Sequence, residues 1–562
     1  MPKRQLMNAL SFRSIRGQNK VLFMEKVQNE DGTIVKNIIK EDKPGFSFYI
    51  TKPEFRISKP TNFIEIDKVE KLECDYDDLF RVLFDNNRKA QEEGLSFEEF
   101  YNNNKQSLSA FHGDYNIHLS DIDLTDYKIK EYQDRYANEE GFFKLEKGFF
   151  DIEVDISNYF QFPEPEEAPC PVCLISYFHE ASMTLHGFIL NDPTNKSQQE
   201  FLENIDLEWF ETTRLEYFSE EKSEIKELDL HIFDDELELI TEFFKMVNSQ
   251  KPDFMCGWNT YFDLKTMEQR LEQLYEKKND EKSFSAATVI MSDPSLKMSQ
   301  RKVYFSEDTF NQTDHSKKND RLFVTAFPQY VDLKFAYASI RIPKGKKDSY
   351  ALDDITTEEL NQGKIELDGD IRTSLRKNFE NFLIYSLTDS YRLYQLENKN
   401  KDVDLLHGMA SLTATRFTKV LSKTTSLRNF AAKLLFKEGI VLSNNKNRMK
   451  REQKKEKFKG AYVAPPELMA NNGVILNGVP SNKIFENVID EDLSSMYPSI
   501  ILSCNIDSTT MIGKITSELD YHIGEKIFTW LIEDDTSIVA TNLLSLPTAS
   551  EVLNDLENYL TE

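Results

Sequence analysis

Four acidic residues occur in three short segments, and the local pattern of each segment fixes how its carboxylates are presented. They are Asp151 and Glu153 in FFDIEV, Asp263 in GWNTYFD, and Asp389 in YSLTD. The first segment reads as a strand, and the other two place polar groups at the i, i+4 spacing of a helix. The predicted strands and helices alternate up to about residue 395, which favours an α/β domain.

Asp151 and Glu153 are two residues apart in the predicted strand, so their side chains point to the same side. Neighbouring carboxylates repel each other unless a divalent cation lies between them. However, the net charge of −27 makes acidic residues common in this chain. Two ordinary acids on a solvent-facing strand explain this short pattern better, so the pair alone does not identify a metal site.

Each of the two other segments pairs a polar side chain with an acid one helical turn later. Asn259 and Asp263 would lie on one face of a helix that follows a strand at residues 253–256. Alternatively, the Asn caps the helix and the Asp is a first-turn acid. Tyr385, one turn before Asp389, could orient a metal-bound water, although a core tyrosine beside an exposed Asp gives the same pattern.

Taken together, the four acids favour a metal site. Hydrolysis of a phosphodiester bond needs a nucleophile near neutral pH and a stabilised oxyanion, and two divalent ions roughly 4 Å apart supply both. Carboxylate oxygens are suitable ligands for Mg²⁺ or Mn²⁺. We therefore expect the four acids to hold two such ions, with the Tyr385 hydroxyl positioning the attacking water.

Length and composition bound the rest of the chain. A chain of 562 residues is expected to form roughly three to five domains. Five Cys argue against a disulfide framework and fit a reducing cytoplasm. The N-terminus lacks the apolar stretch of a signal peptide, and no segment has the ~20 apolar residues of a membrane helix. We therefore expect a cytoplasmic protein with no membrane segment.

The pattern along the chain predicts an alternation of strands and helices up to about residue 395. Short apolar runs predict further strands at residues 172–178 and 186–190. The polar region 264–330 predicts exposed loops or a hairpin. Residues 404–438 have a helical pattern that Gly439 would end.

Basic residues are concentrated in one segment of this acidic chain. Residues 401–470 hold 15 Lys and Arg against 6 Asp and Glu, and residues 446–459 read KNRMKREQKKEKFK. This run predicts either a solvated basic segment or a surface that binds phosphates.

Cys170-Pro-Val-Cys173, with His179 and His186, superficially suggests a zinc site. Structural zinc pairs usually have a longer loop between them, and these residues lie along two predicted strands. We therefore assign them to the core and the surface.

The segment DLSSMYPSII at residues 492–501 closely resembles the first polymerase motif of family B DNA polymerases. The resemblance implies that Asp492 binds both polymerase metal ions, helped by the carbonyl of Leu493. It also implies that Tyr497 stacks under the incoming sugar and excludes ribose; Met496 replaces the usual leucine. The nucleotide-binding residues implied are Leu493, Ser494, Ser495, Met496 and Tyr497.

Other segments resemble the same family. The order of the four acids and Tyr385 is that of its proofreading 3′–5′ exonucleases, and Gly460-Ala-Tyr-Val463 resembles its template-contacting loop. Phe162-Pro-Glu-Pro165 and Ser349-Tyr-Ala-Leu-Asp-Asp-Ile355 are similar to the T-even-type bacteriophage branch. The DNA contacts implied are Gly460, Ala461, Tyr462, Asn259 and Phe262.

The resemblance implies an α+β multidomain protein that includes a ribonuclease-H-like exonuclease domain. The implied parts are an N-terminal domain at 1–147, the exonuclease domain at 148–400, a helical basic segment packing with the N-terminal domain at 401–458, a partial palm at 459–547, and the start of the fingers at 548–562. The implied substrates are primer–template DNA and dNTPs. A sliding clamp is a further partner, in the host cytoplasm if a phage encodes the chain.

Two motifs that the family needs for polymerisation do not occur in the sequence, a Lys-x₃-Asn-Ser-x-Tyr-Gly helix and an Asp-Thr-Asp-Ser hairpin. One carboxylate cannot assemble a two-ion polymerase site. We expect a second chain to supply the remaining fingers, palm and thumb, and to cover an amphipathic helix predicted after Thr548-Ala-Ser-Glu551. A truncated polymerase would give the same sequence. A stand-alone exonuclease and a non-catalytic DNA-binding subunit are the alternative functions.

Overall fold

The computed structural model divides the chain into two compact units, Met1–Lys454 and Lys455–Glu562. It describes residues 2–444, apart from gaps at 15–16, 60, 93, 106–107, 160–161, 219–224, 279–284, 364, 366 and 368, and a few short stretches between 475 and 541. The strands described in the second unit are β17 (Ile475–Leu476), β18 (Val479–Pro480), β19 (Thr516–His522), β20 (Glu525–Ile532) and β21 (Thr536–Thr541). The last three of these form an antiparallel sheet.

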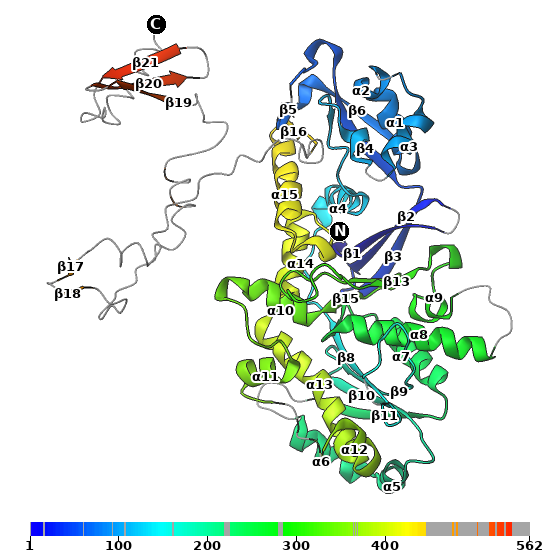
Figure 1. Ribbon diagram of the computed structural model, residues 1–562. Helices are drawn as coiled ribbons and strands as arrows, with labels where there is room; N and C mark the ends of the chain where they lie inside the picture. Colours follow the sequence, from blue (N-terminus) through cyan, green and yellow to red (C-terminus); the bar gives the residue numbers. More distant parts are fainter. Residues whose placement is uncertain are drawn as a thin grey trace. The chain divides into compact units, whose positions relative to one another are not determined.

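A six-stranded mixed sheet, called the central sheet below, lies in the lower half of the first unit in Figure 1. Its order is β11 (Glu227–Phe233), β10 (Thr184–Leu190), β9 (Val172–His179), β8 (Lys147–Val154), β12 (Phe254–Gly257) and β15 (Gln329–Asp332). Strand β9 is antiparallel to both of its neighbours, and the other neighbouring pairs are parallel. The strands predicted at 149–154, 172–178 and 186–190 are confirmed, as is the mixed α/β class.

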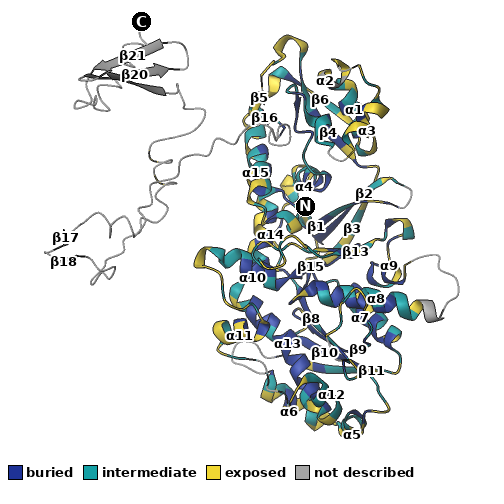
Figure 2. Cartoon of the chain, in the orientation of Figure 1, coloured by how far each residue is buried: buried dark blue, intermediate teal, exposed yellow. Residues whose placement is uncertain are grey.

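Helices cover both faces of this sheet, and the buried residues gather in the sheet and in these helices (Figure 2). On one face, Phe149 packs in a cluster with residues of α13 (Phe379–Asn400). On the other, Phe150 and Ile152 pack with residues of α7 (Glu236–Gln250) and α8 (Thr260–Lys278). Because side chains alternate along a strand, the acids of β8 share the face of Phe149 and α13.

The N-terminal residues form two small antiparallel sheets. The first contains β1 (Lys3–Arg13), β2 (Asn19–Gln28) and β3 (Ile34–Asp42); the second contains β4 (Gly45–Thr51), β6 (Val69–Asp75) and β7 (Ile117–His118). Strand β2 is tied to the central sheet through Lys26, whose Nζ lies 2.6 Å from Oδ2 of Asp253. Both side chains are buried, so this ion pair lies away from water.

The helical region after α13 leads to a strand that pairs with a strand of the N-terminal residues. It consists of α14 (Asp402–Thr413) and α15 (Lys423–Lys437), not one continuous helix, because Ala414 has a φ of 51° and interrupts it. Gly439, with a φ of 76°, follows α15 as predicted. Strand β16 (Ile440–Leu442) then pairs with β5 (Phe63–Glu65).

The region 264–330, predicted as exposed loops or a hairpin, contains the hairpin of β13 (Val303–Ser306) and β14 (Arg321–Val324). The first part of this region is helical, however, because α8 continues to Lys278 and α9 (Ala286–Met291) follows. The remaining α-helices are α1 (Leu79–Asn86), α2 (Arg88–Glu92), α3 (Phe97–Asn104), α4 (Leu124–Arg135), α5 (Lys196–Asn204), α6 (Leu207–Tyr217), α10 (Leu333–Arg341), α11 (Leu352–Leu360) and α12 (Ile371–Lys377). Among the described residues, no helix is both long enough and apolar enough to cross a membrane.

Candidate active site

The four acids come from three elements that meet beside the central strand β8. Asp151 and Glu153 lie on β8, Asp263 is in the first turn of α8, and Asp389 is near the middle of α13. Helix α8 starts directly after β12, which pairs with β8. The sheet order therefore brings together acids that are more than one hundred residues apart in the sequence.

Three of these carboxylates form a tight group. Oxygen atoms of Asp151, Glu153 and Asp389 all lie within 4.8 Å of one another. Asp389 is 2% exposed, whereas the two strand residues are partly exposed. Three carboxylates this close, one of them in the protein interior, repel one another. Their oxygen atoms are the ligands that hard divalent cations prefer, and they are close enough to share one.

Asp263 is not part of this 4.8 Å group but is close enough to interact with it electrostatically. It is 4% exposed, and its Oδ2 has no hydrogen-bond partner among the described residues. Burial raises its pKa well above the usual range, and the negative charges of Asp151, Asp332 and Glu153 raise it further. An unpartnered buried carboxylate is costly, and a cation held by these acids would remove that cost.

Hydroxyl groups fix α13 against the sheet. The Ser386 hydroxyl donates to Oε1 of Glu153 at 3.3 Å. One turn later, the Ser390 hydroxyl donates to the carbonyl of Ser176 in β9 at 3.1 Å. Asp389 lies between these two contacts in the sequence, so its position relative to β8 is set from both sides.

Asp332 is a buried acid of the site that the sequence reasoning missed. It ends β15 next to Gly257 and accepts hydrogen bonds from the backbone N–H groups of Thr260 at 2.9 Å and Asn259 at 3.4 Å. Burial raises its pKa to about 6. Its carboxylate therefore holds the start of α8, and with it Asp263. An Asp between a short apolar run and a helix was the signal that could have revealed it.

The prediction that Asn259 and Asp263 share a helical face is wrong. Asn259 lies before α8 with a φ of 70°, a left-handed conformation in which the chain turns sharply out of β12. Asp263 is a first-turn acid, as the alternative reading held. Asn, which tolerates this conformation better than most residues, is used here for the turn.

Two phenylalanine rings lie side by side, and one of them, Phe262, directly precedes Asp263 in α8. The rings of Phe162 and Phe262 have centroids 5.1 Å apart, and Phe162 is 61% exposed. The Tyr261 hydroxyl donates to Oε1 of Glu166 at 2.7 Å, which ties the loop that follows β8 to α8. Tyr385 is 9% exposed and lies one turn before Asp389 on α13.

The polymerase-motif predictions concern residues outside those the structure describes. These residues are Asp492, Leu493, Ser494, Ser495, Met496, Tyr497, Gly460, Ala461 and Tyr462.

Comparison with known proteins agrees with this geometry. Residues 108–324 match the family model described as the DNA polymerase family B exonuclease domain. The match includes Asp151, Glu153 and Asp263 and ends before Tyr385 and Asp389.

Two curated relatives are DNA-directed DNA polymerases of bacteriophages. The one from Escherichia phage RB69 is 25% identical over 414 residues, which cover 72% of this chain and 40% of the relative. The one from Enterobacteria phage T4 is 21% identical over 400 residues, which cover 71% of this chain and 40% of the relative. The matched region thus spans about two fifths of each relative. Residues 108–324 therefore match the exonuclease domain of family B DNA polymerases, and over most of its length the chain is similar to the DNA polymerases of T-even-type phages.

Proposed function

We propose that this chain provides the 3′–5′ exonuclease of a family B DNA polymerase and removes nucleotides from the 3′ end of a primer. The observation that carries the proposal is the meeting of Asp151, Glu153 and Asp389 within 4.8 Å, beside a buried Asp263. The match of residues 108–324 to the exonuclease domain supports the same reading.

The donor set fits divalent metal ions. Asp151, Glu153, Asp263 and Asp389 would hold two Mg²⁺ or Mn²⁺ ions, since all four offer carboxylate oxygens and Oδ2 of Asp263 lacks a partner among the described residues. When bound, such ions generate a nucleophile from water near neutral pH and stabilise the departing 3′-oxyanion.

The protein's own residues position these groups. Ser386 orients Glu153 through its hydroxyl, and the carboxylate of Asp332 fixes the first turn of α8. We assign the Tyr385 hydroxyl to orienting the attacking water, because residues four apart on α13 lie on one face and Tyr385 precedes Asp389 by four.

The aromatic pair at the first turn of α8 suits a single-stranded substrate. A base that has left the duplex can stack on an exposed ring, whatever its identity. Phe162 presents such a ring, supported from behind by Phe262. We propose that these rings receive the last unpaired bases of a frayed primer, so that Phe262, as well as Asp263 beside it, contributes to the site.

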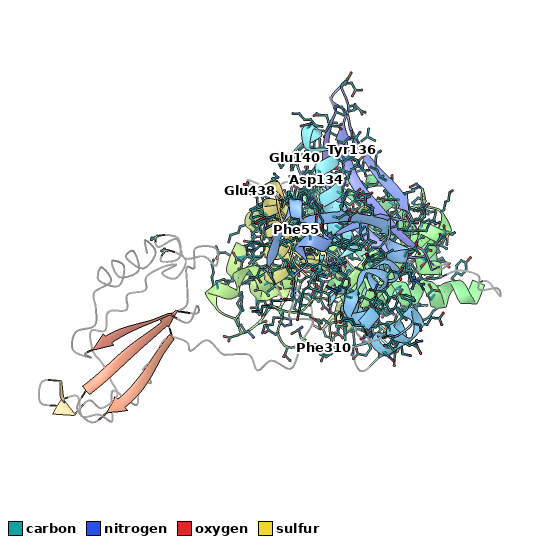
Figure 3. All side chains as sticks on the ribbon, turned by 90° about the horizontal axis from the view of Figure 1, so that it is seen from above. Phe55, Asp134, Tyr136, Glu140, Phe310 and Glu438 are labelled. Atoms are coloured by element: carbon teal, nitrogen blue, oxygen red, sulfur yellow. The ribbon has the colours of Figure 1, made fainter. Side chains whose placement is uncertain are left out.

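Replacing Phe162 by Ala should weaken binding of single-stranded DNA, because base–aromatic stacking contributes about 1–3 kcal/mol per base. We expect KM for a single-stranded oligonucleotide to rise about 5- to 150-fold with little change in kcat, measured with a 5′-labelled oligothymidylate. Phe310→Ala is the matched control, because Phe310 is 97% exposed in the loop between β13 and β14 (Figure 3). An equal effect of both substitutions would contradict the assignment.

The proposed activity is tested with the purified chain, a 5′-labelled primer–template, Mg²⁺ and all four dNTPs. We expect a ladder of shortened primers that disappears when Mg²⁺ is chelated. If no shortening occurs although the chain binds the DNA, the non-catalytic DNA-binding alternative replaces the exonuclease.

Primer extension is not expected from this sequence alone, because the fingers and second palm motifs do not occur in it. In our proposal, Asp492 and Tyr497 contribute to polymerisation only together with those motifs. Extension by the chain alone, in the assay above, would contradict this part of the proposal.

A further inference from the structure

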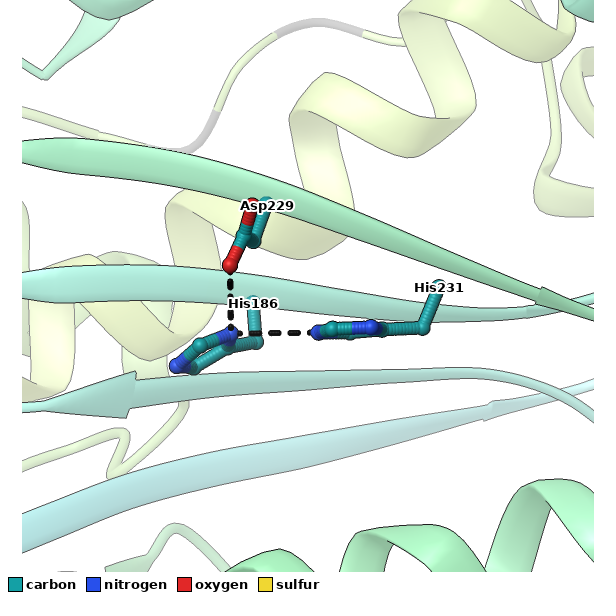
Figure 4. Close-up of side chains that lie close together, drawn as sticks. All are labelled: His186, Asp229 and His231. Atoms are coloured by element: carbon teal, nitrogen blue, oxygen red, sulfur yellow. Dashed lines mark hydrogen bonds and ion pairs between the residues drawn. The ribbon is translucent and has the colours of Figure 1, made fainter.

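A second group of potential metal ligands lies at the edge of the central sheet. His186 is on β10, and Asp229 and His231 are on the neighbouring edge strand β11 (Figure 4). Nδ1 of His186 lies 3.2 Å from Nε2 of His231 and 3.7 Å from Oδ2 of Asp229. One potential ligand atom from each of the three residues lies within 4.8 Å of the other two.

Strand pairing explains why these three side chains meet. Strands β10 and β11 are parallel, and His186 is directly opposite Asp229. His231 follows Asp229 by two residues and therefore points to the same face. This register places the three side chains together, although His186 and Asp229 are more than forty residues apart in the sequence.

The group is separate from the exonuclease acids. Phe188, two residues after His186, packs in the same cluster as Phe150 and Ile152, on the sheet face covered by α7. Asp151 alternates with these two residues on β8 and so faces the opposite side, toward α13. The two groups thus occupy opposite faces of one sheet.

The spacing fits a tetrahedral transition-metal ion. An ion bound at about 2.0–2.1 Å holds its ligand atoms about 3.3–3.4 Å apart. The distances of 3.2 Å and 3.7 Å from Nδ1 of His186 lie on either side of this value. Two imidazole nitrogens with one carboxylate oxygen favour Zn²⁺ over Mg²⁺, which prefers oxygen ligands alone.

The surroundings hold the rings in place. The Tyr177 ring stacks on His186 with centroids 5.8 Å apart and an interplanar angle of 17°, and Phe188 lies 4.9 Å from the His231 ring. Burial lowers the pKa of His186 to about 3 and also lowers the pKa of His231.

A hydrogen bond alone explains this arrangement less well. His186 and His231 can share one proton at 3.2 Å, but 3.7 Å is too long for a hydrogen bond from His186 to Asp229. The carboxylate thus lies beside the two rings without a hydrogen bond from His186. Its side chain is 45% exposed, which leaves a path by which an ion and a completing water can enter.

We propose that His186, Asp229 and His231 bind one divalent transition-metal ion, with Zn²⁺ the best match. The ion would cross-link the edge strand β11 to β10. The site does not use the Cys170-Pro-Val-Cys173 pair weighed from the sequence: the Cys173 thiol donates to the carbonyl of Glu153 at 3.4 Å, away from His186. In the sequence, the pattern that points to this metal site is Asp229-x-His231 in one strand together with His186 in another.

The test titrates Zn²⁺ alone into the full chain after chelator treatment, by calorimetry, with Co²⁺ absorption as a probe of tetrahedral geometry. We expect one equivalent to bind at this site. Asp229→Asn and His231→Gln should each lower its affinity at least as much as loss of a second-shell partner does, about 10- to 100-fold. Glu227→Gln is the matched control, because it removes an exposed carboxylate two residues earlier on β11 and should change nothing.

The variant Asp389→Asn tests whether the Zn²⁺ is bound by the exonuclease acids instead. We expect this variant still to bind one equivalent of Zn²⁺ at His186, Asp229 and His231. A Zn²⁺-dependent rise in Tm that is lost in Asp229→Asn provides a second readout, since an ion that binds only the folded state stabilises it. Melting without metal shows whether each variant folds. Binding that survives both Asp229→Asn and His231→Gln, or no binding at all, would overturn the proposal.

Discussion

Replacing Asp389 by Asn is expected to lower the rate of primer shortening about 100- to 1000-fold, the scale seen when one preorganised charge-stabilising group is removed from an active site. Asp389 brings the α13 carboxylate into the group with Asp151 and Glu153. The amide keeps the shape of the side chain but removes the charge that would hold a divalent ion. The measurement is a single-turnover time course with 5′-labelled primer and saturating enzyme.

The same substitution should not lower stability in the absence of metal. Asp389 is 2% exposed and lies beside two other carboxylates, so neutralising it removes repulsion in the folded state. Glu242→Gln on α7 is the matched control, because Glu242 is paired with Lys245 on the surface and should affect neither rate nor stability. Full activity of Asp389→Asn in a folded protein would exclude the proposed metal site.

The largest loss of stability is expected from Lys26→Met. The Lys26 side chain is 1% exposed, and its Nζ contacts Oδ2 of Asp253 at 2.6 Å and Oε1 of Glu146 at 3.0 Å. Removing one partner of a buried ion pair leaves an uncompensated charge and costs about 3–5 kcal/mol. Chemical denaturation by urea, followed by circular dichroism, would measure the change in the free energy of unfolding.

Two further variants show whether burial is the cause. Lys130→Met removes a surface partner of Asp134 and should cost less than about 1 kcal/mol. The double variant Lys26→Met with Asp253→Asn should be more stable than Lys26→Met alone, because it also removes the orphaned negative charge. If Lys26→Met and Lys130→Met cost the same, the buried pair does not join the N-terminal sheet to β12 in the way that its contacts indicate.

The local part of the site could be predicted from the sequence because it depends on short periods. The alternation around Asp151 and Glu153 gave their common face, and the four-residue step from Tyr385 to Asp389 placed both on one helix. The prediction that these elements meet came from the chemistry of the four acids, which together suit a metal site. The spacing of the acids in the sequence did not give it. Residue-by-residue resemblance then gave the order of the motifs.

What the sequence did not reveal depends on which strands are neighbours. Asp332 fixes the start of α8 only because β15 lies beside β12, and His186 meets Asp229 only through the register of two parallel strands. No periodicity within a strand encodes its neighbour. The interruption of the helical region at Ala414 was missed for a related reason, because a left-handed residue there has no strong sequence signal.

The pairing of β5 with β16 also has a consequence for synthesis. Ile64 is opposite Val441, and a ribosome adding about 5–20 residues per second needs roughly 20–75 s to travel from the first to the second. During that time the edge of β5 has no partner strand, while the whole central sheet emerges behind it. The N-terminal part therefore gains this strand pairing only after the central sheet has been made, although it is translated first.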